Sequence, residues 1–387
     1  MTELRFDFAT AQRIIFGSGT LQSLEKILPD YGQRYLVVTG EKYPDPGGLF
    51  SLLNCAGVSM VQFIVPHEPD IDLVEKCIAY GRLNKCEAVI GFGGGAVIDT
   101  GKAVAALLNN EGNLLDYLEV VGRGLPLQKP SLPYIAVPTT AGTGSEVTRN
   151  AVISIPNNRV KVSLRHAFLL PALALIDPQQ TMSVPASITA STGMDAFTQV
   201  VEPYVTKITN PVVDMFCRQA IPLAARNLPT AYSNGDDVEA RENMSYVSLL
   251  GGLSLANAKL GAVHGFAGPI GGMFDAPHGL VCAALLPAVM RVNTNILEQS
   301  GENRQKVSRF KEIARLVTGN EGAAILDGVN WITNLAHSME VPGLAQFGIT
   351  EDDFPGIIEK ARRSSSMKGN PVDLSDFDMK RILSMSL

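Results

Sequence analysis

The sequence predicts an α/β fold with a parallel sheet in the first part of the chain and an all-α fold in the second part. Three observations lead to this prediction. Strand patterns alternate with helical patterns in the first half, long helical patterns without β-branched runs fill the second half, and 387 residues suit two domains of ordinary size. The pattern changes near Asp177–Pro185, so we expect domains at residues 1–183 and 184–387.

Short apolar runs and helical spacings define the elements of the first domain. The runs that predict buried strands are Tyr35–Thr39, Ala88–Phe92 and Tyr134–Val137. The helical spacings lie at residues 21–28, after the capping residue Asp70 on a face with Val74, Cys77 and Ile78, and at Val97–Leu108. Alternation of this kind predicts a parallel sheet that helices cover on both faces.

The second domain is expected to consist of helices alone. Its long helical patterns are Ala186–Tyr204, Val212–Leu228 and Glu239–Lys259. We find no internal repeat and no long flexible linker in the chain.

Composition excludes several classes of protein. The chain has 32 Lys and Arg against 38 Asp and Glu, a net charge of −6, without basic runs, so we expect neither nucleic acid nor a membrane as a partner. The five cysteines are scattered and form no CxxC pair, which predicts no disulfide framework. The charged start lacks the apolar core of a signal peptide, and no uncharged apolar stretch is long enough to span a bilayer. We expect a soluble cytoplasmic protein.

Glycines cluster between a predicted strand and a predicted helix. In Gly91–Asp99, Gly93, Gly94 and Gly95 let backbone N–H groups approach a phosphate closely at a helix N-terminus. Gly91, Gly93 and Ala96 also fit a G-x-G-x-x-A pattern, but the acid about 20 residues on, Glu111, follows the helix rather than a strand. The alternative is a tight strand–helix turn without a ligand.

A hydroxyl-rich segment, Pro138–Thr148, follows the next predicted strand. Such a loop can hydrogen-bond ribose or phosphate, although it can also be a capped turn. Two polar loops at the carboxyl ends of neighbouring parallel strands favour a ligand site, because ligands bind there in open α/β sheets.

A third group of candidate residues lies in the second domain. Asp195, Gln199 and Glu202 are spaced at i, i+4 and i+7 on one helix face, and two His-Gly pairs begin at His264 and His278. A buried histidine is often only a satisfied core residue. Two of them together with a helix-borne Asp favour a metal or catalytic site.

Four motifs in this order resemble the iron-containing (group III) alcohol dehydrogenase family. They are GGG-x-x-x-D, PTTAGTGSEVT, GMDAxxQxxEPY and HGxxGPxGxxxxxPHG, and the resemblance covers essentially the whole chain. It implies a Rossmann-like, NAD(P)-binding α/β domain and a helical metal and substrate domain, the fold shared with dehydroquinate synthase. The implied activity is NAD(P)-dependent hydride transfer between a small alcohol and its carbonyl compound, in the cleft between the domains.

The resemblance also implies the residues that bind the cofactor. They are Gly40, Gly93, Gly94, Gly95, Asp99, Thr139, Thr140, Thr143, Ser145 and Lys161. In the family an Asp follows the second strand and repels a 2′-phosphate, whereas here Gly40 is followed by Glu41 and Lys42. We therefore lean towards acceptance of NADP, with Lys42 as a phosphate partner and the Glu41 carboxylate as the opposing influence.

The family's metal ligands fall on Asp195, position 199, His264 and His278, but position 199 is Gln and a further family histidine is replaced by Gly268. An amide oxygen is a weaker ligand than imidazole for Fe²⁺ or Zn²⁺. Gln199 is then either a weak fourth ligand or a hydrogen-bond partner of metal-bound water. The other three can still form a catalytic site with an open position.

Alternative readings remain open. A metal-independent reductase of the maleylacetate reductase type would use His264 or His278 as proton donor, with Lys161 as the other cation near the reaction. A lyase resembling dehydroquinate synthase would need more basic residues than the motifs show. A non-catalytic relative has little reason to keep the hydroxyl pattern of Pro138–Thr148. The family resemblance also implies a homodimer or a larger homo-oligomer.

Overall fold

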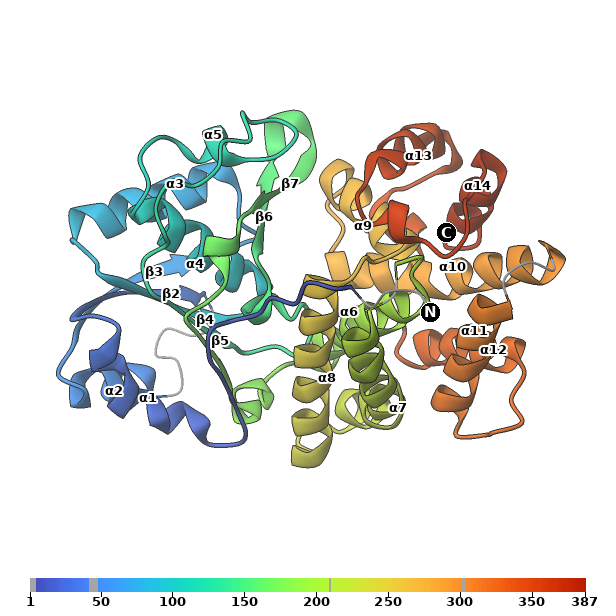
Figure 1. Ribbon diagram of the computed structural model, residues 1–387, viewed down its shortest axis with the longest axis horizontal. Coiled ribbons are helices and arrows are strands. Elements are labelled where there is room, and N and C mark those ends of the chain that lie inside the picture. Colours follow the sequence, from blue (N-terminus) through green and yellow to red (C-terminus); the bar gives the residue numbers. More distant parts are fainter. Residues whose placement is uncertain (1–4, 42–47, 209, 301–303) are drawn as a thin grey trace. The chain divides into compact units, whose positions relative to one another are not determined.

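The computed structural model describes residues 5–41, 48–208, 210–300 and 304–387, which divide into two compact units. The α/β unit contains residues 9–140 and 144–184, and the helical unit contains residues 5–8, 141–143 and 185–387, apart from the gaps (Figure 1). The α/β unit thus ends one residue beyond the expected boundary. Two short pieces lie in the helical unit because Phe8 contacts Phe216 and Gly142 packs against Thr192.

A sheet of six strands, all paired in parallel, forms the centre of the α/β unit, in the order β1-β8-β5-β4-β2-β3. The strands are β1 (Ile14–Phe16), β2 (Arg34–Gly40), β3 (Ser59–Val65), β4 (Ala88–Gly93), β5 (Tyr134–Pro138) and β8 (Leu173–Ile176). The helices of the unit are α1 (Leu24–Ile27), α2 (Leu49–Cys55), α3 (Ile71–Leu83), α4 (Gly95–Leu108) and α5 (Leu114–Tyr117). The three strands expected from the apolar runs are confirmed in β2, β4 and β5.

Two hydrophobic cores cover the two faces of the sheet, as the strand–helix alternation predicts. Alternate side chains of a strand point to opposite faces, so Leu36 and Val38 of β2 pack with α3 and α4, whereas Tyr35 and Val37 pack with α1 and α2. Asp70 caps α3 as expected, because its carboxylate accepts a hydrogen bond of 2.8 Å from the Leu73 N–H.

Several elements differ from the expectation. The helix expected at residues 21–28 is broken into two 3₁₀ turns and the short α1, although its four apolar residues are buried. The sequence patterns did not single out β1, β3 or β8, which are short or partly exposed. They also missed an antiparallel hairpin of β6 (Asn150–Ile155) and β7 (Val160–Arg165) beside the parallel sheet.

The order in which the chain adds strands to the sheet reverses between β2 and β4, which are direct neighbours. After β2 the chain continues to β3 on one side, and after β4 it continues to β5 on the other side. Gly40 and Gly93, which end these two strands, therefore flank the topological switch point where open α/β sheets bind ligands. The Thr139 N–H donates to the Gly93 carbonyl at 3.0 Å, so the glycine and hydroxyl-rich loops are adjacent.

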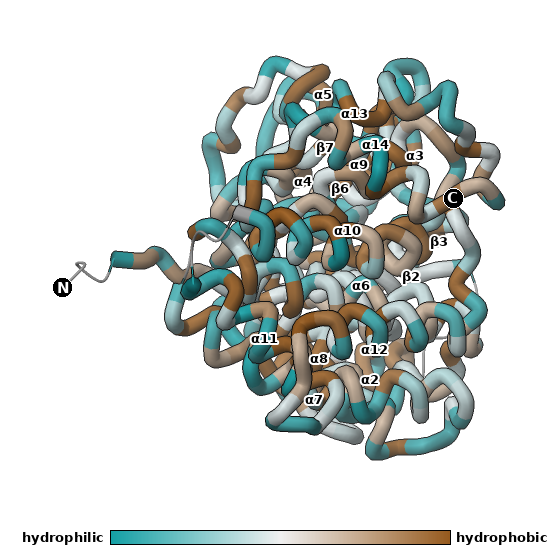
Figure 2. Tube along the Cα trace, turned by 90° about the vertical axis from the view of Figure 1, so that its right-hand side faces the viewer, coloured by the Kyte–Doolittle hydropathy of each residue, from teal (hydrophilic) through white to brown (hydrophobic). Residues whose placement is uncertain are grey.

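The helical unit contains only helices and turns among its described residues, as the sequence predicts. Its helices are α6 (Ala186–Val205), α7 (Pro211–Ser233), α8 (Val238–Asn257), α9 (Ala262–Met273), α10 (His278–Ser300), α11 (Arg304–Thr318), α12 (Ile325–Ser338), α13 (Phe354–Arg363) and α14 (Asp376–Ser384). Hydrophobic and hydrophilic residues alternate along them (Figure 2). The helix α10 is long and apolar enough to cross a membrane, but 67% of that window is buried, as in a core helix.

Candidate active site and metal centre

Packing explains two glycines of the loop after β4 but not Gly94. A Cβ on Gly91 would lie 2.2 Å from the Tyr134 hydroxyl, and one on Gly93 would lie 2.6 Å from Val97. A Cβ on Gly94 would meet Thr140 at 3.4 Å, an ordinary contact, and the φ of Gly94 is −75°. Gly94 is also the N-cap of α4 and makes no side-chain cap hydrogen bond, and the first N–H groups of a helix can bind an anion. Packing therefore does not require a glycine at position 94, and the absence of a side chain there leaves room for a ligand.

A buried lysine that the sequence analysis missed organises the hydroxyl-rich loop. Lys102 is 1% exposed, and its ammonium group donates to the Ser145 carbonyl and hydroxyl, to the Thr148 hydroxyl at 3.0 Å and to the Asn150 carbonyl. It also lies 3.2 Å from the carboxylate of Asp99, one helical turn earlier. The only signal in the sequence was a lysine inside an otherwise apolar helical pattern.

Asp99 and Ser145 are therefore bound to each other and to Lys102 rather than standing alone. The Ser145 hydroxyl donates to one Asp99 oxygen, and the Val152 N–H donates to the other at 3.0 Å. Thr139 is buried beside Gly93. Thr143 belongs to the segment 141–143, which groups with the helices. The roles of these residues at a cofactor stay predictions.

The remaining cofactor candidates lie at the edges of this region. The Lys161 ammonium group on β7 forms an ion pair with Glu68. Gly40 ends β2, and Glu41 is exposed directly after it, whereas Lys42 lies outside the described residues. The catalytic role of Lys161 and the phosphate contact of Lys42 stay predictions.

The candidate metal ligands of the helical unit lie together. Asp195 on α6, His264 on α9 and His278 at the start of α10 have donor atoms within 4.8 Å of one another, and the thiol of Cys282 belongs to the same group. His264 Nε2 lies 3.3 Å from Asp195 Oδ1, and His278 Nε2 lies 3.9 Å from that oxygen. Cys282 was not a candidate in the sequence analysis because its motif shows only the two His-Gly pairs.

Glu202 orients His264. One carboxylate oxygen accepts from His264 Nδ1 at 2.7 Å, and the other accepts from the Val263 N–H at 2.7 Å. A proton on Nδ1 leaves the lone pair of Nε2 directed towards Asp195 and His278, which is the tautomer that a metal ligand needs. Glu202, seven residues after Asp195 on α6, is thus a positioning residue for His264.

Three buried polar atoms of this cluster lack hydrogen-bond partners in the part of the chain that the structure describes. They are Asp195 Oδ1, Gln199 Oε1 and His264 Nε2. Buried acceptors without partners are costly, so their convergence calls for a bound cation or water. Carboxylate, imidazole and thiolate donors fit a divalent transition metal, and the His278 side chain, 37% exposed, gives the site an accessible side.

Burial and mutual contact shift the pKa values of the groups in the cluster, and the pKa of His264 lies well above its usual value. Burial opposes ionisation of Asp195, yet contact with His264 and the charges of the imidazoles keep the pKa of its carboxyl below its usual value. Burial also acts to raise the pKa of the Cys282 thiol, but His278 and His264 hold it below its usual range. The Cys282 thiolate in turn raises the pKa of His278 to about 9.

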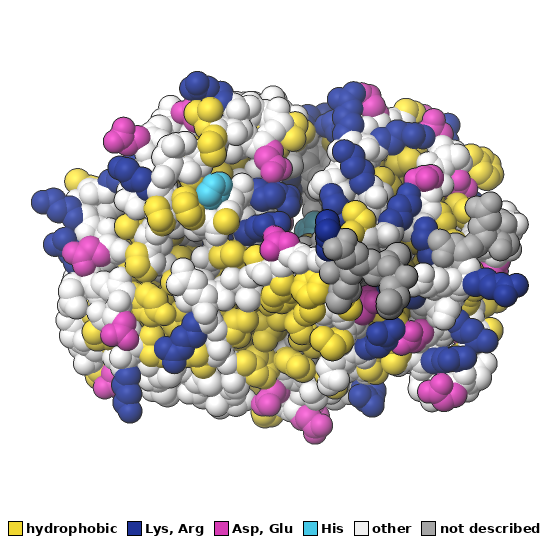
Figure 3. Space-filling view, viewed as in Figure 1, with side chains coloured by type: hydrophobic (Ala, Val, Ile, Leu, Met, Phe, Trp, Pro, Cys, Tyr) yellow, Lys and Arg dark blue, Asp and Glu magenta, His cyan; other side chains and the backbone are white. Residues whose placement is uncertain are grey.

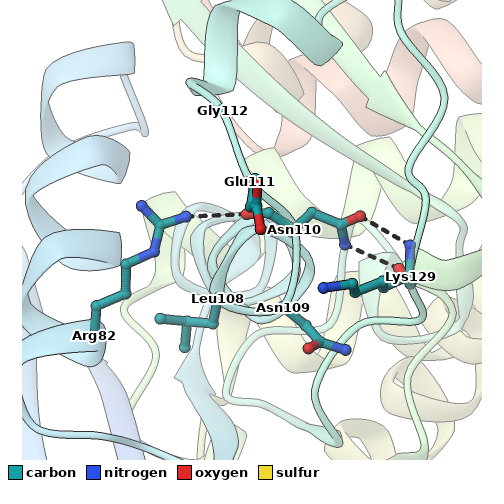
Figure 4. Close-up of a pocket in the computed structure, with 7 residues that line it drawn as sticks. All are labelled: Arg82, Leu108, Asn109, Asn110, Glu111, Gly112 and Lys129. Carbon is teal, nitrogen blue, oxygen red and sulfur yellow. Dashed lines mark hydrogen bonds between the residues drawn. The ribbon is translucent and has the colours of Figure 1, made fainter.

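The α/β unit also has a polar pocket of about 330 Å³ beside Leu108, the last residue of α4 (Figure 4). Two of its polar side chains, Arg82 and Asn110, are used to hold the surrounding backbone. Arg82 donates to the carbonyls of Leu107 and Asn110, and the Asn110 side chain holds Gln128 and Lys129 through their backbone. These side chains therefore hold a loop in place, and the pocket is not the candidate site.

Figure 3 shows acidic and basic side chains interspersed over the visible face.

Fold and site together point to a two-unit enzyme class, with a dinucleotide-type sheet and a helical unit that carries a cluster of potential metal ligands. Comparison with known proteins gives the family. The iron-containing alcohol dehydrogenase model matches residues 11–178, and the model of the C-terminal part of that family matches residues 189–387.

Individual relatives agree over nearly the whole chain. The 1,3-propanediol dehydrogenase of Klebsiella pneumoniae is 38% identical over 385 residues, 96% of each chain. A 1,3-propanediol oxidoreductase structure has a TM-score of 0.90 at 33% identity and covers 99% of this chain and all of the other. Sulfoacetaldehyde reductase of Bifidobacterium kashiwanohense, solved in complex with NAD⁺, has a TM-score of 0.88 at 28% identity and covers 99% of both chains.

The chain therefore belongs to the iron-containing alcohol dehydrogenase family, and it is an oxidoreductase of that family. The family and the fold class expected from the four motifs are confirmed.

The first prediction concerns the buried Glu146, which is next to Ser145 in the hydroxyl-rich loop. Burial raises the pKa of Glu146 to about 7, although its own backbone N–H and Lys102 act to lower it. Because the native state then binds more protons than the unfolded state between pH 4.5 and 7, this residue should lower stability as pH rises through that window. In Glu146→Gln, the loss of unfolding free energy across this window should be smaller than in the wild type by up to about 3 kcal/mol.

Urea unfolding at pH 5, 6, 7 and 8 measures this difference. Glu111→Gln, at an exposed position of the same unit, is the matched control and should keep the wild-type slope. Equal slopes in Glu146→Gln and the wild type would show that Glu146 does not titrate in this range.

The second prediction concerns Glu202. Glu202→Gln places an amide against His264 Nδ1 and weakens control of the tautomer, so affinity for Zn²⁺ should fall about 10–100-fold. Competition with a fluorescent chelator measures the dissociation constant. Glu239→Gln, at an exposed position on α8, should leave it unchanged. A Glu202→Gln protein that binds Zn²⁺ as tightly as the wild type contradicts the positioning role.

Proposed function

We propose that this oxidoreductase interconverts a small alcohol and its aldehyde or ketone with NAD(P) as the hydride carrier. In the oxidative direction the carbinol carbon gives a hydride to the nicotinamide and the hydroxyl gives up a proton, which yields a carbonyl compound and NAD(P)H. The observation that carries this proposal is the convergence of Asp195, Gln199 and His264 through buried acceptors without partners. The family membership supports the same reaction.

The cofactor is proposed to lie across the end of β4 and the loop after β5. Gly94 supports this placement because its missing side chain is not needed for packing, and because α4 begins there. The switch point between Gly40 and Gly93 supports it independently. Gly40 has no carboxylate to repel a 2′-phosphate, so we expect NADPH to be accepted beside NADH.

A divalent cation is proposed to be held by Asp195, His264 and His278. When bound, it supplies a Lewis acid for the substrate oxygen, where negative charge develops during hydride transfer. Asp195 contributes negative charge, Glu202 fixes the tautomer of His264, and the partly exposed His278 borders the side open to a substrate. In a metal-independent reductase, His278 would be the proton donor instead.

The space beside α9 bears on the substrate. Gly268 lies one turn after His264, and a Cβ there would meet no atom within 4 Å. The imidazole that the family has at this position is replaced by space, so we propose a substrate larger or differently polar than ethanol. The propanediol dehydrogenase of Klebsiella pneumoniae makes short diols and hydroxyaldehydes suitable members of a test panel. A homo-oligomer and a cytoplasmic location stay predictions.

The third prediction tests this function directly. Purified protein should oxidise NADH or NADPH, followed at the nicotinamide absorbance band, when a small aldehyde is added. Exhaustive chelation should abolish the activity, and Zn²⁺ or Fe²⁺ should restore it. Activity that survives in metal-free protein would establish the metal-independent mechanism. Protein that turns over no aldehyde with either cofactor would refute the proposal.

The fourth prediction separates cofactor binding from folding. Gly94→Ala adds a methyl group that the fold accommodates, but it should obstruct the approach of a pyrophosphate and weaken NAD(P)H binding at least 10-fold, about 1.4 kcal/mol. Titration calorimetry measures the affinity. Gly356→Ala in α13, whose Cβ would also meet only one ordinary contact, is the control. Unchanged affinity in Gly94→Ala would move the cofactor away from this loop.

A further inference from the structure

We propose that Cys282 is a thiolate ligand of the cation. It takes the place of the histidine that the family has at position 199, where this chain has Gln199. This inference rests on the proposed cation site and specifies its ligand set as Asp195, His264, His278 and Cys282. Such a mixed carboxylate, imidazole and thiolate set favours Zn²⁺ over Fe²⁺, because a thiolate is a soft ligand and Zn²⁺ lies above Fe²⁺ in the affinity series.

The donor atoms of the four groups lie close enough together to bind one metal ion. With metal–ligand bonds of about 2.0–2.3 Å, the ligand atoms of a tetrahedral zinc site lie about 3.3–3.8 Å apart. The separations here are 3.3 Å from His264 Nε2 to Asp195 Oδ1, 3.7 Å from Cys282 Sγ to His278 Nε2 and 3.9 Å from His278 Nε2 to Asp195 Oδ1. Two of these separations fall in that range and the third is slightly longer, and the donor atoms of all four groups lie within 4.8 Å of one another. The four groups are therefore close enough to bind one common ion.

The helix α10 places Cys282 at this centre. His278 and Cys282 are four residues apart, so they share one face of the helix. The Cys282 side chain is fully buried, and the groups around its sulfur are the imidazoles of His278 and His264 and the carboxylate of Asp195. Cys217, the other buried cysteine of the helical unit, lies instead beside the Ser254 hydroxyl.

Unpartnered atoms that do not belong to the cysteine point to a cation at the same place. Asp195 is 2% exposed and His264 is 8% exposed. Each has an atom that can bind a metal, Asp195 Oδ1 and His264 Nε2, without a hydrogen-bond partner among the described residues. Gln199, one turn after Asp195, contacts that carboxylate. A primary amide is the poorest ligand of the group, so Gln199 would support Asp195, the thiolate would be the fourth protein ligand, and the substrate oxygen would be the fifth ligand.

Cobalt(II) titration of the metal-depleted protein tests the proposal, because a cobalt–thiolate bond gives a charge-transfer band in the near ultraviolet. The wild type should show this band together with the visible bands of bound Co²⁺. Cys282→Ser should lose the near-ultraviolet band and bind Zn²⁺ about 100-fold more weakly or worse. Cys217→Ser, the matched control, should keep both properties.

A double variant makes the test independent of any folding defect in Cys282→Ser. Gln199→His with Cys282→Ser restores the imidazole of the family and should regain tight Zn²⁺ binding without the thiolate band. Bound Co²⁺ in the wild type without that band would overturn the thiolate ligand and leave the proposed function intact. Failure of the wild type to bind Co²⁺ or Zn²⁺ would overturn both the ligand and the cation site, and the aldehyde assay then shows whether a metal-independent reductase remains.

Discussion

The hydrogen bond between Glu202 and His264 is the constraint on which the cation centre depends. A buried carboxylate is expensive unless it is paired, and Glu202 satisfies its two oxygens with the His264 ring and the Val263 N–H. It thereby joins α6 to the first turn of α9 and presents the second nitrogen of the ring to Asp195. Without this contact, Asp195 and His264 would still be near each other, but the lone pair of the imidazole would not be fixed between them.

A buried ion organises the α/β unit in a comparable way. Lys102 offers three N–H donors, and its acceptors all come from Asp99 and from residues 145–150. The ammonium group thus holds the hydroxyl-rich loop to α4, the helix that begins at Gly94. Local sequence patterns suggest that this loop binds a ligand, but the contacts show that several of its polar groups first serve to shape the loop itself.

The sequence predicts the parts of the structure that local patterns encode. Continuous apolar runs predict β2, β4 and β5 because both faces of a parallel sheet are buried. The strands β1, β3 and β8 are missed because they are short or partly exposed. Asp195, His264 and His278 were predictable from their motifs. Cys282 and Lys102 were not, because their roles depend on contacts between α9, α6 and α10, or between α4 and a distant loop, that no spacing reveals.

The proposed ligand set has a simple explanation in helix geometry. On an α-helix, positions i and i+4 point to the same side, so α6 offers Asp195 and Gln199 to the centre, and α10 offers His278 and Cys282. A donor lost from the second position of one helix can therefore be replaced from the second position of the other. Gln199 and Cys282 occupy these two positions, so the proposed thiolate ligand would replace the missing imidazole from the equivalent position of the other helix.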